Sequence, residues 1–229
     1  MAEVEGRRPL GILMLETRFA RLPGDIGNPA SFAFPVIFEV VEAASADRVV
    51  RERAKGLLDS FIDAGKRLVD QGAIGLMTSC GFLALHQPTL AAALPVPVAT
   101  SSLLMVPMVE RLLPAGRRVG VLTASADDLT AAHLAAVGGA VTTPIGGLEP
   151  ASHLATVLFG GDQLLDPTLA QADLLQAADR LLARHQDIGA LVLECTNMGP
   201  YAPALARHTG LPAFDVVGFA HWFYRGLCP

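Results

Sequence analysis

Two cysteines at matching places in the chain are the residues best suited to chemistry. Cys80 ends the run LMTSC and Cys195 ends the run LVLEC, 115 positions later. The prolines Pro88 and Pro203, which follow them, keep the same offset. A thiolate is both a base and a nucleophile. Two thiols brought to one place could therefore exchange a proton with a carbon atom from opposite sides.

A second pair of apolar runs supports an internal repeat. GILMLET begins at Gly11 and GVLTASA begins at Gly120, 109 positions later. We interpret the chain as two copies of one α/β unit, each bringing a thiol to the same place. A cysteine that follows a strand is more often a core residue than a catalyst. Two cysteines that repeat in register with matching prolines are hard to ascribe to packing alone.

The composition limits the kinds of partner. Of the 229 residues, 52% are hydrophobic and 17% are charged, which suits buried sheets. The formal charge is −5, and the basic pairs at residues 7–8 and 117–118 are too few for a nucleic-acid surface. The first apolar run is about six residues long, short of a signal-peptide core or a membrane span. We therefore predict a cytoplasmic protein with no nucleic-acid or membrane partner.

The cysteine count argues for free thiols. Three cysteines form no disulfide framework, and no CxxC motif or histidine cluster has metal-ligand spacing. Cys228 lies outside the repeat, and we interpret it as an incidental thiol. We therefore expect reduced cysteines and no metal.

Apolar runs and helical periodicity alternate along the chain. We predict a long loop at residues 17–35, which could act as a lid, and a turn at residues 160–162. The strands are expected at residues 10–15, 36–41, 73–79, 96–99, 119–123, 140–145, 189–194 and 213–217. The helices are expected at residues 46–71, 125–137, 151–159, 166–185 and 203–208, with a short one near Pro88. This alternation predicts two parallel sheets covered by helices.

In such a fold both cysteines lie on the ligand side. Ligands of parallel sheets bind beyond the carboxyl ends of the strands, and each cysteine ends a predicted strand. The N–H groups of the helical turn that follows favour a thiolate. If the two copies face each other about a pseudo-twofold axis, the thiols lie on opposite walls of one cleft.

The motifs TSCGF at residues 78–82 and ECTNM at residues 194–198 resemble those of the aspartate/glutamate racemase superfamily. That superfamily also includes hydantoin racemases, maleate isomerases and arylmalonate decarboxylases, and the resemblance covers essentially the whole chain. It implies two pseudo-symmetric Rossmann-like or flavodoxin-like lobes, an active site between them, and no pyridoxal phosphate, metal or other cofactor. It also implies that the last strand returns to the first lobe. The first lobe would then be residues 1–98 plus 212–229, and the second residues 99–211. By family analogy alone we expect a homodimer.

From these features we predict a racemase or isomerase of a small carboxylate substrate, in which Cys80 and Cys195 exchange the base and acid roles. A substrate carboxylate would contact hydroxyl, amide and backbone N–H groups near strand ends, and residues of the first loop could orient a thiol or contact an ammonium group. The candidate substrate-binding residues are Glu16, Asp25, Asn28, Ser79, Gly81, Thr123, Ser125, Thr196 and Asn197. One alternative is a cysteine nucleophile that isomerises or decarboxylates a small diacid. Another is an inactive two-lobed protein that binds a small molecule.

Overall fold

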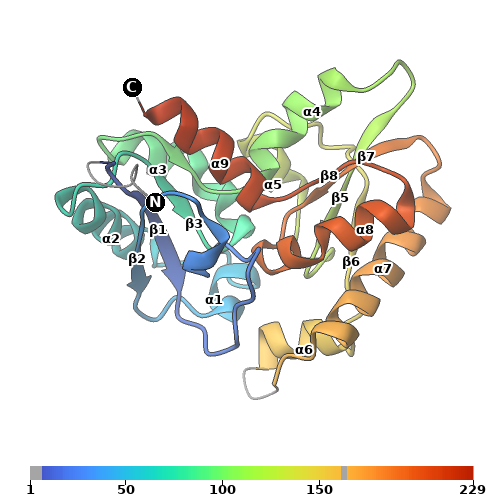
Figure 1. Ribbon diagram of the computed structural model, residues 1–229, viewed down its shortest axis with the longest axis horizontal. Coiled ribbons are helices and arrows are strands. Elements are labelled where there is room, and N and C mark those ends of the chain that lie inside the picture. The colour runs from blue at the N-terminus through green and yellow to red at the C-terminus, as the bar shows by residue number, and fades with distance from the viewer. Residues whose placement is uncertain (1–6, 161–163, 229) are drawn as a thin grey trace.

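The computed structural model describes residues 7–160 and 164–228 and contains two four-stranded sheets side by side (Figure 1). The first has the order β2-β1-β3-β4, and the second has the order β6-β5-β7-β8. All neighbouring strands are parallel. The strands are β1 (Leu10–Leu15), β2 (Val36–Val41), β3 (Leu76–Thr78), β4 (Val98–Ala99), β5 (Arg118–Thr123), β6 (Ile145–Gly147), β7 (Ile188–Leu193) and β8 (Ala213–Phe214). The predicted α/β class with two parallel sheets is confirmed.

Helices cover the faces of both sheets, as parallel strands require. The α-helices are α1 (Ala46–Val50), α2 (Leu58–Asp70), α3 (Gln87–Ala93), α4 (Val106–Leu112), α5 (Ala131–Ala136), α6 (His153–Gly160), α7 (Pro167–Arg184), α8 (Ala202–Thr209) and α9 (Val216–Leu227). Helix α2 places Phe61, Ala64 and Leu68 against the first sheet, because these residues share one face at helical spacing. Helix α7 covers the second sheet and begins at Pro167, where Asp166 caps two backbone N–H groups.

One apolar core joins the two lobes. Ala190 and Val192 of β7 belong to the core that also contains β1 and α2. Leu191 and Leu193 point to the opposite face and join a separate core with α7 and α8. Because side chains alternate along a strand, the second sheet contributes one face to each core. The lobes are thus packed together through shared side chains.

The helix that follows the last strand of each sheet packs against the other lobe. After β4, the 3-10 turn η3 (Ser102–Met105) and α4 contact β7 and β5 of the second sheet. After β8, α9 returns to the first lobe, where Tyr224 donates to the backbone oxygen of Arg8 at 2.9 Å and stacks on Phe34. Figure 1 shows α9 beside the first lobe. This exchange is reciprocal, as expected of a duplicated unit.

The prediction that the last strand returns to the first lobe was wrong. Strand β8 pairs with β7, with Leu191 opposite Ala213, and so forms an edge of the second sheet. The segment that returns is α9, which the sequence analysis did not predict. Asp215 ends the strand after two residues, because its carboxylate caps the N–H groups of Val217 and Gly218.

The single helix predicted for residues 46–71 is two helices. Helix α1 ends at Val50 and α2 begins at Leu58. Between them Arg53, Ala54 and Gly56 have φ angles of 54°, 54° and 73°. A right-handed helix does not continue through left-handed residues, so the apolar periodicity is kept while the helix is interrupted.

Other elements are shorter or shifted. The helix predicted for residues 125–137 is confined to α5, because Thr130 and not Ser125 is its N-cap. The strand predicted for residues 140–145 lies at β6, where Ile145 pairs with Val121. The strands predicted for residues 73–79 and 96–99 shorten to β3 and β4. The predicted turn at residues 160–162 lies mostly outside the described residues; Gly160 ends α6.

Candidate active site

The two cysteines occupy equivalent positions at the ends of β3 and β7. Cys80 precedes the 3-10 turn η2 (Gly81–His86), and Cys195 precedes the 3-10 turn η4 (Thr196–Tyr201). Each sulfur accepts the backbone N–H group two residues ahead, from Phe82 for Cys80 and from Asn197 for Cys195. The repeat seen in the sequence is thus also a repeat of the local geometry around each thiol.

Hydrogen bonds across the lobes hold the two cysteine loops together. The hydroxyl of Thr196 donates to the backbone oxygen of Ser79 at 2.8 Å, and so joins the residue after one cysteine to the residue before the other. The hydroxyl of Ser79 accepts the N–H of Leu15 at 2.8 Å, at the end of β1. All of these groups are buried. The thiols therefore sit on a rigid base that both lobes share.

Cys80 and Cys195 line one small cavity between the lobes, of about 40 Å³. At about 10 to 15 Å³ for each water, it holds roughly three water-sized molecules. Most of its wall is apolar and comes from both lobes. The lining residues are Leu15, Thr17, Phe19, Arg21, Ala46, Val50, Ser79, Cys80, Gly81, Phe82, Ala124, Leu158, Phe159, Glu194, Cys195, Thr196 and Asn197.

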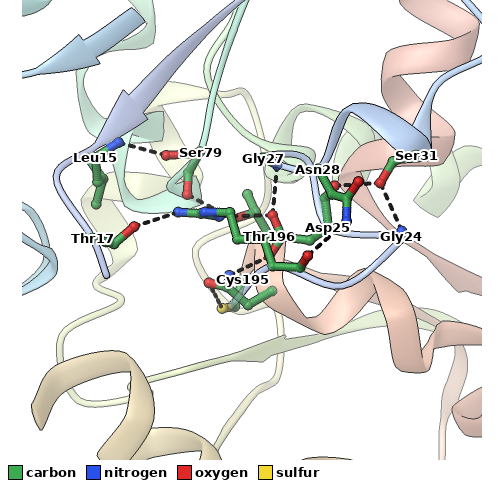
Figure 2. A network of polar contacts seen from close by, with 12 residues as sticks. Leu15, Thr17, Gly24, Asp25, Gly27, Asn28, Ser31, Ser79, Cys195 and Thr196 are labelled. Carbon is green, nitrogen blue, oxygen red and sulfur yellow. Dashed lines mark hydrogen bonds and ion pairs between the residues drawn. The ribbon is translucent and has the colours of Figure 1, made fainter. Parts of the chain in front are cut away.

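A buried polar network ties the first loop to the second cysteine (Figure 2). Asp25 accepts hydrogen bonds from Arg21 at 2.8 Å and from the side-chain amide of Asn197 at 2.5 Å. The amide oxygen of Asn197 in turn accepts the thiol of Cys195 at 3.6 Å. The guanidinium of Arg21 also donates to the hydroxyl of Thr17 at 2.9 Å. The loop at residues 17–35 thus walls the cavity through side chains with fixed partners.

Burial raises the pKa of both thiols. For Cys80 the buried position is the largest cause, followed by the negative charge of Glu194, while the positive charge of Arg21 acts in the opposite direction. The pKa of Cys195 is raised by burial, then by Glu194, with smaller contributions from Cys80 and Asp25. Both cysteines are therefore protonated thiols in this structure, and Cys80, which the charge of Arg21 acts on, is the easier to ionise.

Six of the residues predicted from the sequence for the site line the cavity: Ser79, Cys80, Gly81, Cys195, Thr196 and Asn197. Asp25 reaches it through Asn197. Asn28 stays inside the loop, where its side chain donates to the backbone oxygen of Arg21 and caps the turn η1 (Pro29–Ser31). The roles proposed for these residues stay predictions.

The other three predicted residues lie away from the cavity or behind its wall. Thr123 is fully buried and donates to the carboxylate of Glu194 at 2.6 Å. Glu16 is exposed and accepts the N–H of Ala43 at 3.0 Å. Ser125 lies in a separate, open groove and donates to Asp128 at 2.6 Å. The structure does not bring Glu16 and Ser125 to the two cysteines.

Several residues that line the cavity were not predicted from the sequence. Arg21 and Phe19 come from the long loop, whose sequence gives no periodicity to place them. Phe159 comes from α6 and carries the guanidinium of Arg51 on its ring at 5.1 Å. Glu194 could have been identified from the sequence, because it is a carboxylate inside the apolar run LVLEC.

Residues 7–160 and 164–228 contain no group of three or more His, Cys, Asp or Glu side chains placed to hold a metal ion. Over the same ranges, no helix combines the length and apolar character needed to cross a bilayer.

Comparison with known proteins agrees with the motifs and the fold. The family model for Asp/Glu/hydantoin racemases matches residues 88–223. A dimethylsulfoniopropionate lyase from Durusdinium sp. clade D is 26% identical over 226 residues, which cover 95% of this chain and 74% of the lyase. A sulfate-associated cysteine mutant of arylmalonate decarboxylase has a TM-score of 0.63 at 22% identity, covering 95% of this chain and 92% of that one. The allantoin racemase from Pseudomonas fluorescens has a TM-score of 0.60 at 16% identity, with 95% and 90% covered. The chain belongs to the Asp/Glu/hydantoin racemase family.

Proposed function

We propose that this protein removes a proton from the carbon next to the carboxylate of a small substrate, and that elimination of a group on the neighbouring carbon follows. The observation that carries the proposal is the pair of equivalent thiols, Cys80 and Cys195, in the wall of one cavity. A carbon-bound proton is removed by a positioned base, and a thiolate is a suitable base near neutral pH.

The charges around the two thiols favour different roles for them. The positive charge of Arg21 favours the thiolate of Cys80. The negative charge of Asp25 disfavours the thiolate of Cys195, whose proton is donated to Asn197. We therefore assign the base to Cys80 and a protonated, donating thiol to Cys195. The guanidinium of Arg21 would also attract the substrate carboxylate.

Elimination is favoured over other outcomes by sequence relatives such as the dimethylsulfoniopropionate lyase from Durusdinium, whose match covers 95% of this chain. That substrate has a carboxylate and, on the second carbon from it, a dimethylsulfonium group. When the thiolate takes the proton next to the carboxylate, the C–H electron pair forms a C=C bond. The C–S bond then breaks, and dimethyl sulfide leaves with its electrons. The other product is acrylate.

The aromatic wall suits a sulfonium cation. Phe19 and Phe159 line the cavity, and each already has a guanidinium over its ring, Arg21 at 4.9 Å and Arg51 at 5.1 Å. A cation over an aromatic face is stabilised by about 0.5 to 2 kcal/mol. Because the cavity is smaller than such a substrate, binding requires Phe159 or its neighbours to move.

Release of dimethyl sulfide tests this proposal. The purified protein is incubated with dimethylsulfoniopropionate, and the gas phase is measured by gas chromatography while acrylate is measured by proton NMR. We expect release by the wild type and by Cys228→Ser, which is the control for loss of a thiol outside the cavity. We expect Cys80→Ser to lose it. Equal release by Cys80→Ser and the wild type would refute the assignment of the base.

Racemisation is the second candidate, because the two thiols are equivalent in their backbone geometry. One thiolate would then remove the proton and the other thiol would protonate the opposite face, with the roles reversed for the other enantiomer. Chiral chromatography of single enantiomers of amino acids and hydantoins tests it. In this case Cys80→Ser and Cys195→Ser should each abolish racemisation.

A further inference from the structure

The carboxyl group of Glu194 is an unexplained feature of the cavity wall. Its side chain is fully buried at the end of β7, directly before Cys195. One oxygen, Oε2, accepts the hydroxyl of Thr123 at 2.6 Å. The other, Oε1, has no hydrogen-bond partner among the described residues. A buried carboxylate with one unsatisfied oxygen is costly, so a functional reason is expected.

Glu194 is next to the loops that carry both thiols. It is the residue before Cys195, and its carboxyl group lies against Gly81, the residue after Cys80. A methyl group on Gly81 would collide with both Oε1 and the backbone oxygen of Glu194, so only glycine allows this approach. The charge of Glu194 raises the pKa of both cysteines. The carboxyl group is thus close enough to interact electrostatically with each thiol.

We propose that Glu194 is the proton acceptor that converts the Cys80 thiol into the catalytic thiolate. This inference rests on the proposed function and adds the step before it. Three facts of geometry carry it: the complete burial of the carboxyl group, the unpartnered Oε1, and the contact with Gly81.

The proposed step conserves protons and electrons. The proton of the Cys80 thiol moves to Oε1 of Glu194, so the negative charge passes from the carboxylate to the sulfur. The thiolate then takes the substrate proton and becomes a thiol again, while the leaving group departs with the C–S electron pair. Glu194 returns its proton to solvent when the cavity opens for product release. The net result is one proton released for each substrate converted.

Burial makes Glu194 suitable for this role, because it raises the pKa of the carboxyl group from 4.5 to about 7. The hydrogen bond from Thr123 acts in the opposite direction. The other charged or titratable groups that act on the two thiols are Arg21 and Asp25 of the first loop. A carboxyl group with this pKa is ionised at pH 8 and can accept a proton, in a transfer that is uphill because burial also raises the pKa of the Cys80 thiol.

The test compares Glu194→Gln with the wild type in two assays. The glutamine keeps an acceptor for Thr123 but takes up no proton. Turnover number is measured with dimethylsulfoniopropionate, and alkylation by iodoacetamide is measured at Cys80 and Cys195 by peptide mass spectrometry. We expect kcat to fall by about 100-fold or more, the usual effect of losing an acid–base group. We expect alkylation of Cys80 at pH 8 to become slower as well, because the thiol has lost the group that accepts its proton.

The two assays separate this role from a structural one. A carboxylate that only opposes ionisation would give Glu194→Gln a higher kcat, and that result overturns the proposal. Faster alkylation of Cys80, or a lower kcat with unchanged alkylation, also overturns it, because Glu194 would then not be the group that accepts the Cys80 proton. Glu42→Gln removes an exposed carboxylate and is the control for net charge.

A second variant keeps the proposal testable if Glu194→Gln does not fold. Thr123→Val removes the hydrogen bond that lowers the pKa of Glu194. In the wild type, the plot of alkylation rate against pH should change slope near pH 7, where Glu194 ionises. In Thr123→Val this change of slope should move to higher pH. An unmoved change of slope overturns the inference. Because alkylation needs no substrate, this result is independent of whether dimethylsulfoniopropionate is turned over.

Discussion

Replacing Glu194 by glutamine should change the free energy of unfolding more favourably at high pH than at low pH. Burial raises the pKa of Glu194 from 4.5 to about 7. Each pKa unit corresponds to about 1.36 kcal/mol, so the buried carboxylate lowers the free energy of unfolding by about 3 kcal/mol once it is ionised. The sign follows from the raised pKa. The destabilisation is absent below the unfolded pKa of 4.5, grows between pH 4.5 and 7, and is constant above.

The glutamine amide has a cost of its own, because its N–H groups replace an oxygen that has no partner. That cost, of about 1 to 3 kcal/mol, does not depend on pH. The informative quantity is therefore the difference between Glu194→Gln and the wild type at two pH values. Going from pH 5 to pH 8, this difference should move in favour of the variant by about 2 kcal/mol.

Urea denaturation followed by circular dichroism at pH 5 and pH 8 measures the difference. Two-state unfolding must first be established, since the chain has two lobes. Glu42→Gln, which removes an exposed carboxylate, controls for the change in net charge. A difference between variant and wild type that is the same at both pH values would refute the reasoning, because Glu194 would then ionise alike in the folded and unfolded chain.

Three further changes test the site and its walls. Gly81→Ala should lower the free energy of unfolding by about 2 kcal/mol in urea denaturation, because the new methyl group collides with the carboxyl group of Glu194. Asp25→Asn should lower it by about 3 kcal/mol in the same assay, because the buried Arg21 loses its ion partner. Phe159→Ala should speed the alkylation of both cavity cysteines by iodoacetamide, measured by mass spectrometry, because the ring forms part of the cavity wall.

Each of these changes has a control or a contradicting result. Gly226→Ala adds a methyl group where nothing lies within 4 Å, and should not destabilise the protein. An Asp25→Asn variant as stable as the wild type would show that Arg21 finds solvent or another partner. Unchanged alkylation in Phe159→Ala, with Cys228 as the internal reference, would show that reagents reach the thiols by another route.

Much of the fold could be predicted because the duplication is visible in the sequence. Short apolar runs that end in Cys80 and Cys195 gave the central strand of each sheet, and parallel strands followed from alternation with helices. The interruption after α1 was not visible. It depends on Arg53 and Ala54 adopting left-handed angles, and neither residue type indicates such a conformation.

Helix α9 could have been predicted and was not. Asp215 followed by apolar residues at Val216, Phe219 and Ala220 has the cap and the spacing of a helix start. The run AFDVV also fits a strand, and the expectation of a last strand in the first lobe favoured that interpretation. The segment that returns to the first lobe is therefore helix α9 and not a strand.

The site was predictable where it depends on strand ends, and not where it depends on loop packing. Residues next to each cysteine reach the cavity because they follow the carboxyl ends of β3 and β7, where the cavity lies. Arg21 reaches it through its bond with Asp25, and that contact depends on how the whole loop folds back. Glu16 was expected to join the site because it follows the first strand, but its carboxylate accepts the N–H of Ala43 instead.

The central claim is that a thiol of the shared cavity removes the proton next to a substrate carboxylate. Proton NMR in deuterium oxide tests it most directly, with dimethylsulfoniopropionate, amino acids, hydantoins and substituted malonates as substrates. We predict that at least one of these compounds loses the signal of the proton next to its carbonyl or carboxylate group with the wild type and with Cys228→Ser, and keeps it with Cys80→Ser. Exchange at the wild-type rate by a protein that lacks both Cys80 and Cys195 would contradict the claim.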